Sequence, residues 1–349
     1  MFAGAAFTDS ADIKVDTEVV DTLVSLGVIE GFEDGSFQPN GTVTRAQMAK
    51  MIYVLRTGNS DASAYNDDKT SFTDINGHWA RGYIKYCQSL NIIAGKSSTI
   101  FAPNASVTAQ EAAKMLLVTL GYNAQKAGLV GTGWASKTNA LADENGLLDD
   151  VNTSFTAACP RQYAAQLIYN TIFANTVILR DGEYTNMNLL GTDKLETVGE
   201  KYMGLSKTEG VLVASGKTGI NGQSTAKEDS LGVNVLTTNA AGVTETAYDY
   251  AADVTFTKVA KDYTALLGQV VKVLYKDGDK SKVYGVFATD DNNVLAGNST
   301  DLEKKTATKV KFDGTEYDVA ATTLVTVNGV KKNVALADAA DQYKDTAAT

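Results

Sequence analysis

Arg45 is the residue whose type and position best suit binding chemistry, because it follows Thr44 at the predicted start of a helix. The free amides and the dipole of a helix start favour an anion. A guanidinium placed there adds bidentate pairing with a carboxylate or a phosphate. The alternative is an exposed arginine in an ordinary surface ion pair. We therefore expect an anionic ligand at Arg45.

Capping residues define the helix starts that would position such a site. Thr44 with Gln47, and Thr108 with Glu111, fit reciprocal capping boxes, in which each side chain bonds the other residue's backbone amide. A third helix is expected to start at Cys159, with Pro160 at the first helical position, where a missing N–H has no cost.

Arginine occupies the expected place in only one of these helix starts. Ala109 and Pro160 stand where Arg45 does, and Arg161 comes one position later. We therefore expect Arg161 to point elsewhere on its helix, so that its equivalence to Arg45 is weak. Of the three helix starts, only the first is therefore expected to be competent for binding.

The helix starts belong to a repeated unit of helix, loop and second helix. In the first two copies, matching residues lie 64 positions apart. These pairs are Gly31 and Gly95, Pro39 and Pro103, and Thr44 and Thr108. The third copy is more divergent: Asn145-Gly146 matches the helix end, Phe155 the loop crossing and Cys159 the next helix start, 51 positions after Thr108. Such a repeat predicts stacked units that cannot bury their cores singly.

The first helix of each unit carries apolar residues at helical spacing. They are Val19, Val20, Leu23 and Leu26 in the first copy, and Trp79, Tyr83, Cys87 and Leu90 in the second. A Phe-Thr-Asp segment precedes the helix in both copies, so each unit has the same order of parts.

These motifs resemble the S-layer homology (SLH) module. The matching stretches are F-x-D before each first helix, H-W-A at 78–80, D-G-S-F-Q-P at 34–39 and T-R-A-Q at 44–47. The resemblance covers roughly residues 5 to 178 and is strongest in the first copy. SLH modules come as three repeats in a three-pronged pseudo-threefold spindle. The family tethers proteins to bacterial cell walls, commonly through pyruvylated secondary cell-wall polysaccharide.

The resemblance implies polysaccharide-binding roles for particular residues. It places Arg45 in contact with the wall polymer and Trp79 near the groove, where its ring either stacks on a sugar or fills the core. Asp9 and Asp74 either cap helices or face the sugar, while Gly31 and Gly35 are turn residues first. The full expected set is Arg45, Thr44, Gln47, Gly31, Gly35, Asp9, Asp74, Trp79 and Arg161.

The charge balance limits the classes of partner. The formal net charge is −10 and the pI about 4.7, and the only basic doublets are Lys304-Lys305 and Lys331-Lys332. These are too few to bind nucleic acid. An anionic wall polymer is repelled overall, so binding requires a local cationic pocket. No run of 18 apolar residues exists, so no transmembrane segment is expected.

The pattern changes from helical to strand-like at about residue 181, with a short helix expected at 194–202. Hairpins are expected at 269–287 around Asp277-Gly278, at 308–319 around Asp313-Gly314, and at 323–334 around Asn328-Gly329. Further strands are expected at 210–214 and 253–256. The alternation of polar and apolar residues predicts antiparallel sheet with one solvated face, in small barrel or sandwich domains.

We therefore predict a multidomain chain, in which an all-α three-repeat SLH pseudo-threefold spindle precedes mainly antiparallel β domains. The predicted parts are SLH repeats at 5–60, 68–123 and 130–178, a linker with a short helix at 181–203, a β domain at 204–295, and the start of a second, truncated β module at 296–349. The small residues at 3–6 resemble those left at a signal-peptidase site. No signal peptide precedes them, so we expect a mature or trimmed chain.

Other chemistries find little support in the sequence. His78 is the only histidine and lies beside no nucleophile motif, so neither a histidine-based triad nor a histidine zinc site is expected. Cys87 is expected to be a buried free thiol, with a Cys87–Cys159 disulfide as the alternative. No cofactor is expected. Asp277-Gly278-Asp279 and residues 290–293 are candidate Ca²⁺ ligands, although such strings are more often hairpin turns.

The sequence favours a non-catalytic, extracellular protein of the cell wall or S-layer. Its expected partners are secondary cell-wall polysaccharide or peptidoglycan, and further copies of itself in a surface lattice assembled by the β domains. The alternative is an extracellular enzyme, a carbohydrate-binding protein or an adhesin that uses the SLH repeats as a tether. Catalysis by two carboxylates stays open in the β half, although no pair is singled out.

Overall fold

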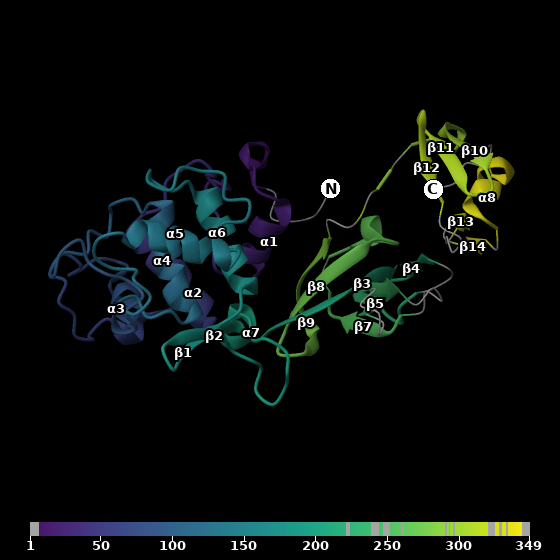
Figure 1. The fold of residues 1–349 in the computed structure, drawn as a ribbon. Coiled ribbons are helices and arrows are strands. Elements are labelled where there is room, and N and C mark those ends of the chain that lie inside the picture. Colours follow the sequence, from purple (N-terminus) through teal and green to yellow (C-terminus); the bar gives the residue numbers. More distant parts are fainter. Residues whose placement is uncertain are drawn as a thin grey trace. The chain divides into compact units, whose positions relative to one another are not determined.

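The computed structural model describes residues 7–220, 224–238, 244–246, 252–259, 261–289, 292, 294–295, 297–319, 325–327, 330–332 and 334–343. The chain divides into two compact units, residues 2–206 and 207–349. The first unit is mainly helical and the second is built mainly from antiparallel strands (Figure 1). The predicted order of a helical part followed by a β-rich part is therefore confirmed.

Three pairs of helices form the repeats of the first unit. They are α1 Thr17–Ser25 with α2 Arg45–Thr57, α3 Arg81–Ser89 with α4 Ala109–Leu120, and α5 Trp134–Glu144 with α6 Arg161–Phe173. Both predicted capping boxes are present. The Gln47 amide donates to the Thr44 hydroxyl (3.2 Å) and the Thr44 amide to the Gln47 side chain (2.8 Å). Thr108 and Glu111 make the same two bonds.

The three repeats close into a ring through the segments that precede α2, α4 and α6. The Val107 amide donates to the Val43 carbonyl (2.9 Å), the Cys159 amide to the Val107 carbonyl (2.8 Å), and the Val43 amide to the Cys159 carbonyl (3.1 Å). Around this ring, each second helix packs against the first helix of the next repeat, α2 on α3, α4 on α5 and α6 on α1. Each repeat therefore completes its neighbour, as expected of stacked units.

The predicted apolar helix face is confirmed in the first repeat and only in part in the second, where Cys87 is buried as predicted. In α1 the four predicted residues are at most 7% exposed. In the second repeat Trp79 and Leu90 are exposed (56% and 39%), whereas Ile84 and Cys87 are fully buried. The buried face begins one residue later than predicted, at Ala80. The Cys87 thiol on this face donates to the Ala49 carbonyl of α2 (3.6 Å).

The register predicted for the third helix start is wrong by one residue. Pro160 is the N-cap of α6, and Arg161 is its first residue. Cys159 takes the place of Val43 and Val107 in the ring, so Pro160 corresponds to Thr44 and Arg161 to Arg45. Proline has no side-chain oxygen that could cap a helix, so the sequence pattern placed Pro160 at the first helical position instead of the N-cap.

Phe155 lies in the loop crossing of the third repeat, as predicted. Its carbonyl accepts the Gln110 amide (3.1 Å), just as the Pro103 carbonyl accepts the Ala46 amide (3.0 Å). In this bonding pattern Phe155 stands in the place of the loop proline.

The segment predicted as a linker at 181–203 packs on the helical unit. β1 Val177–Arg180 and β2 Glu183–Asn186 form an antiparallel hairpin. The short helix is present as α7 Val198–Met203, which begins at a further capping box of Thr197 and Glu200 and contacts α2 and α6. Arg56 of α2 lies over the Tyr202 ring (4.2 Å), which fastens α7 to the repeats.

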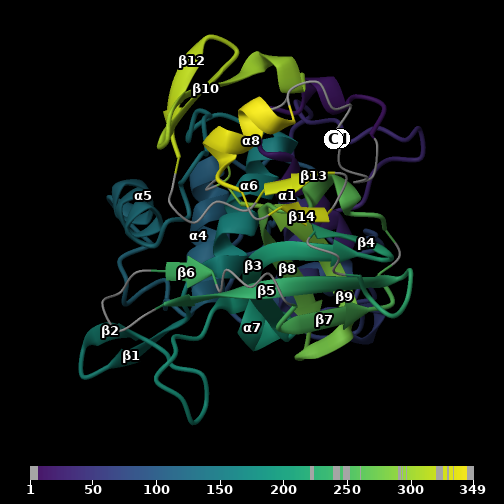
Figure 2. The same cartoon turned by 90° about the vertical axis from the view of Figure 1, so that its right-hand side faces the viewer.

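The strands of the second unit form several antiparallel groups (Figure 2). The largest sheet has the order β6-β5-β3-β8-β9, with β4 paired to β3 and β7 to β5. Its strands are β3 Leu205–Ser215, β4 Thr218–Gly219, β5 Ser230–Thr238, β6 Thr244–Thr246, β7 Val254–Thr257, β8 Val270–Lys276 and β9 Asp279–Ala288. β8 and β9 form the first predicted hairpin, and β3 and β7 the two further strands.

The remaining strands lie after residue 301. They are β10 Leu302–Thr306, β11 Lys309–Phe312, β12 Thr315–Asp318, β13 Val325–Val327 and β14 Val330–Lys332, followed by the helix α8 Leu336–Gln342. The second and third predicted hairpins are confirmed as β11–β12 and β13–β14.

The predicted solvated sheet face is absent along the second half of β3. Leu212 packs with Val233, Phe256 and Val273 in the main core. Val211, on the opposite face, is buried in a separate small cluster. Both faces of β3 are therefore covered there, each by its own cluster of apolar side chains.

Candidate functional site

Arg45 is the first residue of α2 and is buried, with 3% of its surface exposed. Its Nε donates to the Phe101 carbonyl (2.9 Å) and its Nη2 to the Ala94 carbonyl (2.6 Å), and the guanidinium lies 4.5 Å from the centre of the Phe101 ring. Burial lowers the pKa of Arg45, and the nearby carboxylates of Glu111 and Asp74 oppose this. The exposed surface arginine considered as an alternative is therefore wrong. Arg45 joins the first repeat to the loop of the second.

A cavity of about 100 Å³ adjoins Arg45, and we call it the Arg45 groove. Lys96, Glu111, Lys114 and Trp134 line it. Glu111 lies 4.0 Å from Nη1 of Arg45 and forms an ion pair with Lys96. The Lys114 ammonium lies 5.3 Å from the centre of the Trp134 ring. Three cations, one carboxylate and an indole thus meet in a groove to which all three repeats contribute.

Electrostatics keep the groove charged. Burial raises the pKa of Glu111, but the hydrogen bond from Lys96 and the Thr108 amide outweigh burial and leave this pKa below its usual value. Burial lowers the pKa of Lys114, and Arg45 lowers it further, while Glu111 raises it. Lys114 is thus a partly desolvated cation that gains most from an added anion.

Asp9 and Asp74 do not cap helices, so that alternative is wrong. The Asp74 carboxylate accepts the amides of Phe101 (2.9 Å) and Ala102 (2.7 Å), in the loop before α4. Asp9 makes the matching pair of bonds to the loop before α2, each at 2.8 Å. Ala102 has the positive φ of 59° that L-residues rarely adopt, and the carboxylate holds it there. Both aspartates brace loops.

The other predicted residues of the first repeat have structural contacts. Thr44 and Gln47 engage each other in the capping box. Gly35 has φ +77° and makes a turn, as predicted, whereas Gly31 has no such φ. A Cβ on Gly31 would lie 2.6 Å from the Phe7 ring, so ring packing requires this glycine. None of these residues lines the Arg45 groove, because Arg45 reaches the loop of the next repeat rather than its own.

Arg161 repeats the contacts of Arg45, so the prediction that it points elsewhere is wrong. Its Nη2 donates to the Glu30 carbonyl (2.5 Å), and its guanidinium lies 4.9 Å from the Phe32 ring centre and 5.3 Å from that of Phe37. Glu30 and Phe37 lie 64 positions before the two residues whose carbonyls Arg45 bonds. With 7% of its surface exposed, Arg161 joins the third repeat to the loop of the first.

The two tryptophans occupy equivalent positions. Gly133-Trp134-Ala135 repeats His78-Trp79-Ala80, 55 positions further on, and sequence reasoning missed this match. Trp79 is 56% exposed, so the core alternative for it is wrong. Lys96 and Lys114 were also missed, although the 64-residue register places Lys114 at the position of Lys50.

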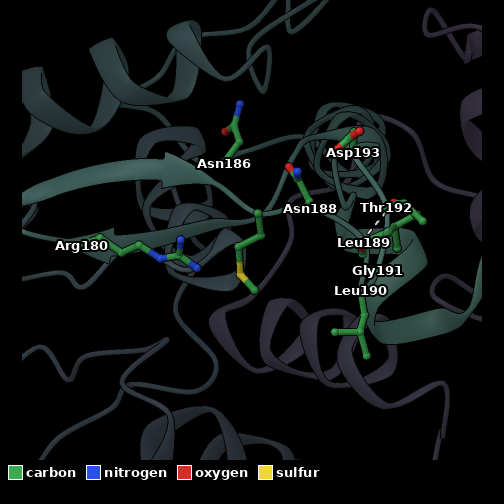
Figure 3. Close-up of a pocket in the computed structure, with 9 residues that line it drawn as sticks. Arg180, Asn186, Asn188, Leu189, Leu190, Gly191, Thr192 and Asp193 are labelled. Atoms are coloured by element: carbon green, nitrogen blue, oxygen red, sulfur yellow. Dashed lines mark hydrogen bonds between the residues drawn. The ribbon is translucent and has the colours of Figure 1, made fainter.

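A second hollow, of about 470 Å³, lies beside the β1–β2 hairpin and the loop that follows it. Arg180, Asn186, Asn188 and Asp193 are its polar residues. Figure 3 shows these side chains standing apart around the hollow rather than converging on one point. Thr192 bonds the Leu189 carbonyl within the loop (3.1 Å). The hollow therefore offers no cluster of charge comparable with the Arg45 groove.

The other candidate chemistries have structural explanations. Cys87 and Cys159 are both free and buried, which confirms the free thiol and excludes the disulfide. Asp279 accepts bonds from Ser281, which lower its pKa to about 2, in the β8–β9 turn. Asp290, Asp291 and Asn293 lie outside the described residues. Within the described part of the chain, no three His, Cys, Asp or Glu side chains are grouped to hold a metal ion.

Comparison with known proteins finds a family model that matches two parts of the helical unit. A family model described as the S-layer homology domain matches residues 6–49 and 71–113, in the first and second repeats. A surface layer protein of Brevibacillus choshinensis is 24% identical over 354 residues, covering 94% of this chain and 31% of the relative. A cellulosome-anchoring protein of Acetivibrio thermocellus is 28% identical over 110 residues, covering 32% of this chain and 25% of the relative.

An exoglucanase of Acetivibrio thermocellus is also similar, with 27% identity over 170 residues, covering 44% of this chain and 15% of the relative. The chain thus spans about a third or less of the length of each of these relatives. Among the residues that the structure describes, no helix is both long and apolar enough to cross a lipid bilayer.

Proposed function

We propose that this chain, whose first half matches S-layer homology domains, is a non-catalytic protein of the bacterial cell surface that is held in the cell wall or S-layer. The helical unit binds an acidic cell-wall polysaccharide through the Arg45 groove. The observation that carries this proposal is the convergence of Arg45, Lys96, Lys114 and Trp134 on one cavity.

The architecture supports the pseudo-threefold spindle. The ring of hydrogen bonds treats the three repeats alike, and each second helix packs on the first helix of the next repeat. The Arg45 groove lies where the repeats meet, and residues of all three repeats line it. A ligand in such a groove contacts several repeats at once, so its binding stabilises the closed module.

The chemistry of the groove suits a carboxylated sugar, such as a pyruvate ketal. Lys96 and Lys114 supply charge at the rim, and the Trp134 ring supplies a stacking surface for the sugar. Peptidoglycan, which also carries carboxylates, is the other wall polymer of matching chemistry. The chain itself has a net charge of −10, so attraction must act at short range within the groove.

Arg45 takes a positioning role in this proposal. Two of its nitrogens are occupied by loop carbonyls, which fix the lining of the groove. Its charge still reaches the cavity and favours an anion beside Lys114. Lys114 and Lys96, which make no backbone hydrogen bonds of this kind, are the residues that we assign to ligand contact.

The β unit is proposed to assemble the surface lattice or to serve as a spacer. β7 and β9 approach each other, as strands do at the seam of a small barrel, and a cluster including Leu212 and Phe256 fills the interior. The similarity to a surface layer protein over most of this chain supports a role in the layer. The exoglucanase similarity supports the alternative, in which the repeats tether an extracellular enzyme or adhesin.

The test is co-sedimentation of the full chain with purified wall sacculi, before and after chemical removal of secondary polysaccharide. Lys114→Ala should lose most binding, because the groove loses a partly desolvated cation that we assign to ligand contact. Lys69→Ala, which removes an exposed lysine outside the groove, is the matched control. Equal binding by both variants would refute the proposed groove. Binding that survives stripping would identify peptidoglycan as the polymer.

A further inference from the structure

Met187, between β2 and α7, is the one sulfur-bearing residue of the described part of the chain that is not buried. Cys87 and Cys159 are fully buried. The other methionines that the structure describes are at most 6% exposed: Met48, Met51, Met115 and Met203. Met187 is only half-buried. It lines the hollow of about 470 Å³ beside the β1–β2 hairpin (Figure 3), so a small solute can reach this side chain.

A cation lies against the sulfur of Met187. Nζ of Lys201, on α7, lies 3.3 Å from Sδ, and this contact is exposed to solvent. The same ammonium forms an ion pair with Glu196 (3.0 Å) and lies 5.7 Å from the centre of the Tyr202 ring. A thioether is a weak hydrogen-bond acceptor. The bond between Lys201 and Met187 is therefore weak while the sulfur is reduced.

The backbone at Met187 is held independently of its side chain. The Met187 amide donates to the Thr176 carbonyl, and the Met187 carbonyl accepts the Glu196 amide, each at 2.8 Å. The Thr176 amide donates in turn to the Glu196 carbonyl (2.8 Å). These three bonds link three segments of the chain in a closed set. A chemical change at Sδ therefore breaks none of the bonds that hold this residue in place.

The chemistry open to an accessible thioether is oxidation to a sulfoxide, for which a hydroperoxide supplies the oxygen. A lone pair of the sulfur attacks one peroxide oxygen, the O–O bond breaks and an S–O bond forms. The other oxygen leaves as water, with the proton that the transferred oxygen gives up. The sulfur loses two electrons, and the peroxide gains them. The product is polar, and its oxygen accepts hydrogen bonds more strongly than the thioether does.

From these observations we propose that Met187 is a reversible oxidation site of the folded protein, with a hydroperoxide as the oxidant and Lys201 as the group that holds the product. The Lys201 ammonium already lies beside Sδ, so it donates a charge-assisted hydrogen bond to the new oxygen. Arg180 and Asn186, which also line the hollow, suit a polar product, whereas the other described methionines lie in the core. Oxidation thus strengthens the contact of Met187 with α7, at a site separate from the Arg45 groove.

The site is tested by mild treatment of the full chain with hydrogen peroxide, followed by peptide mapping with mass spectrometry. The peptide that carries Met187 should gain one oxygen before those that carry the four buried methionines, because oxidation follows exposure. Methionine sulfoxide reductases should then restore its original mass. Oxidation of the buried methionines as fast as Met187 would overturn the proposal, and so would a Met187 sulfoxide that the reductases leave in place.

The role of Lys201 is tested by urea unfolding of the full chain before and after oxidation, followed by tryptophan fluorescence. Oxidation should not lower the unfolding midpoint of the wild type or of Lys201→Arg, which keeps a cationic donor. It should lower the midpoint of Lys201→Ala, in which the sulfoxide has lost this donor. Equal shifts in the wild type and in Lys201→Ala would overturn the role of Lys201. Met187→Leu keeps an apolar side chain of similar size without the sulfur, and a shift in this variant would assign the effect to another residue and overturn the proposal.

Discussion

Replacing Arg45 by alanine should destabilise the helical unit strongly, although the residue was expected from sequence to serve a ligand. The change removes two charge-assisted hydrogen bonds, to Phe101 and Ala94, and a cation–π contact with the Phe101 ring. Removing one partner of a buried charged network costs about 3–5 kcal/mol. For a unit of this size, that lowers Tm by roughly 6–20 °C.

Tryptophan fluorescence is the assay, because both tryptophans of the chain, Trp79 and Trp134, lie in the helical unit. Unfolding of the β unit therefore does not obscure the transition. Arg180→Ala, which removes an exposed arginine at the end of β1, is the control and should change stability by less than about 0.5 kcal/mol. If Arg45→Ala unfolds at the same denaturant concentration as Arg180→Ala, the proposed bridge between repeats carries no stability and the reasoning fails.

Three further outcomes follow from the same contacts. Burial raises the pKa of Asp74, but the hydrogen bonds from the Phe101 and Ala102 amides outweigh burial and leave this pKa below its usual value. The Asp74 carboxylate therefore contributes its full stabilisation above about pH 4, and the contribution is lost as the pH falls through the lowered pKa. Asp74→Asn should therefore flatten the acid limb of a urea-unfolding series, and an unchanged limb would contradict this. Burial raises the pKa of Cys87 and of Cys159 to about 12. A thiol reagent should therefore label neither cysteine in the native protein and both in denaturant. Labelling of the native protein would contradict the burial of these thiols. Deleting the third repeat should abolish cooperative unfolding of the first two, because the ring then opens, and a retained sharp transition would show that the repeats are independent.

Local sequence signals predicted the elements of this fold well. Capping boxes located the starts of α2 and α4, and Asp-Gly turns located the hairpins β8–β9 and β11–β12, because these signals are contained within a few residues. The buried face of the second repeat's first helix was predicted only in part, because Cys87 is buried whereas Trp79 and Leu90 are exposed. The capping box at Thr197 was available in the sequence and was overlooked.

The site was harder to predict, because it is formed between repeats. Sequence reasoning grouped Arg45 with Gly31 and Gly35 of its own repeat, whereas the fold places it against Ala94 of the next. The cyclic packing of helices causes this exchange, and no spacing within one repeat reveals it. Internal comparison did contain part of the answer, since the match of Trp134 with Trp79 identifies a residue that lines the groove.

The same buried arginines connect stability with binding. Arg45 and Arg161 each fasten a second helix to the loop of the following repeat, and Arg45 also lines the Arg45 groove. A ligand that engages the rim therefore adds contacts across a junction that already holds the ring closed. In the proposed function, binding at a junction between repeats therefore couples release of the polymer to opening of the module, which a site on a single helix could not do.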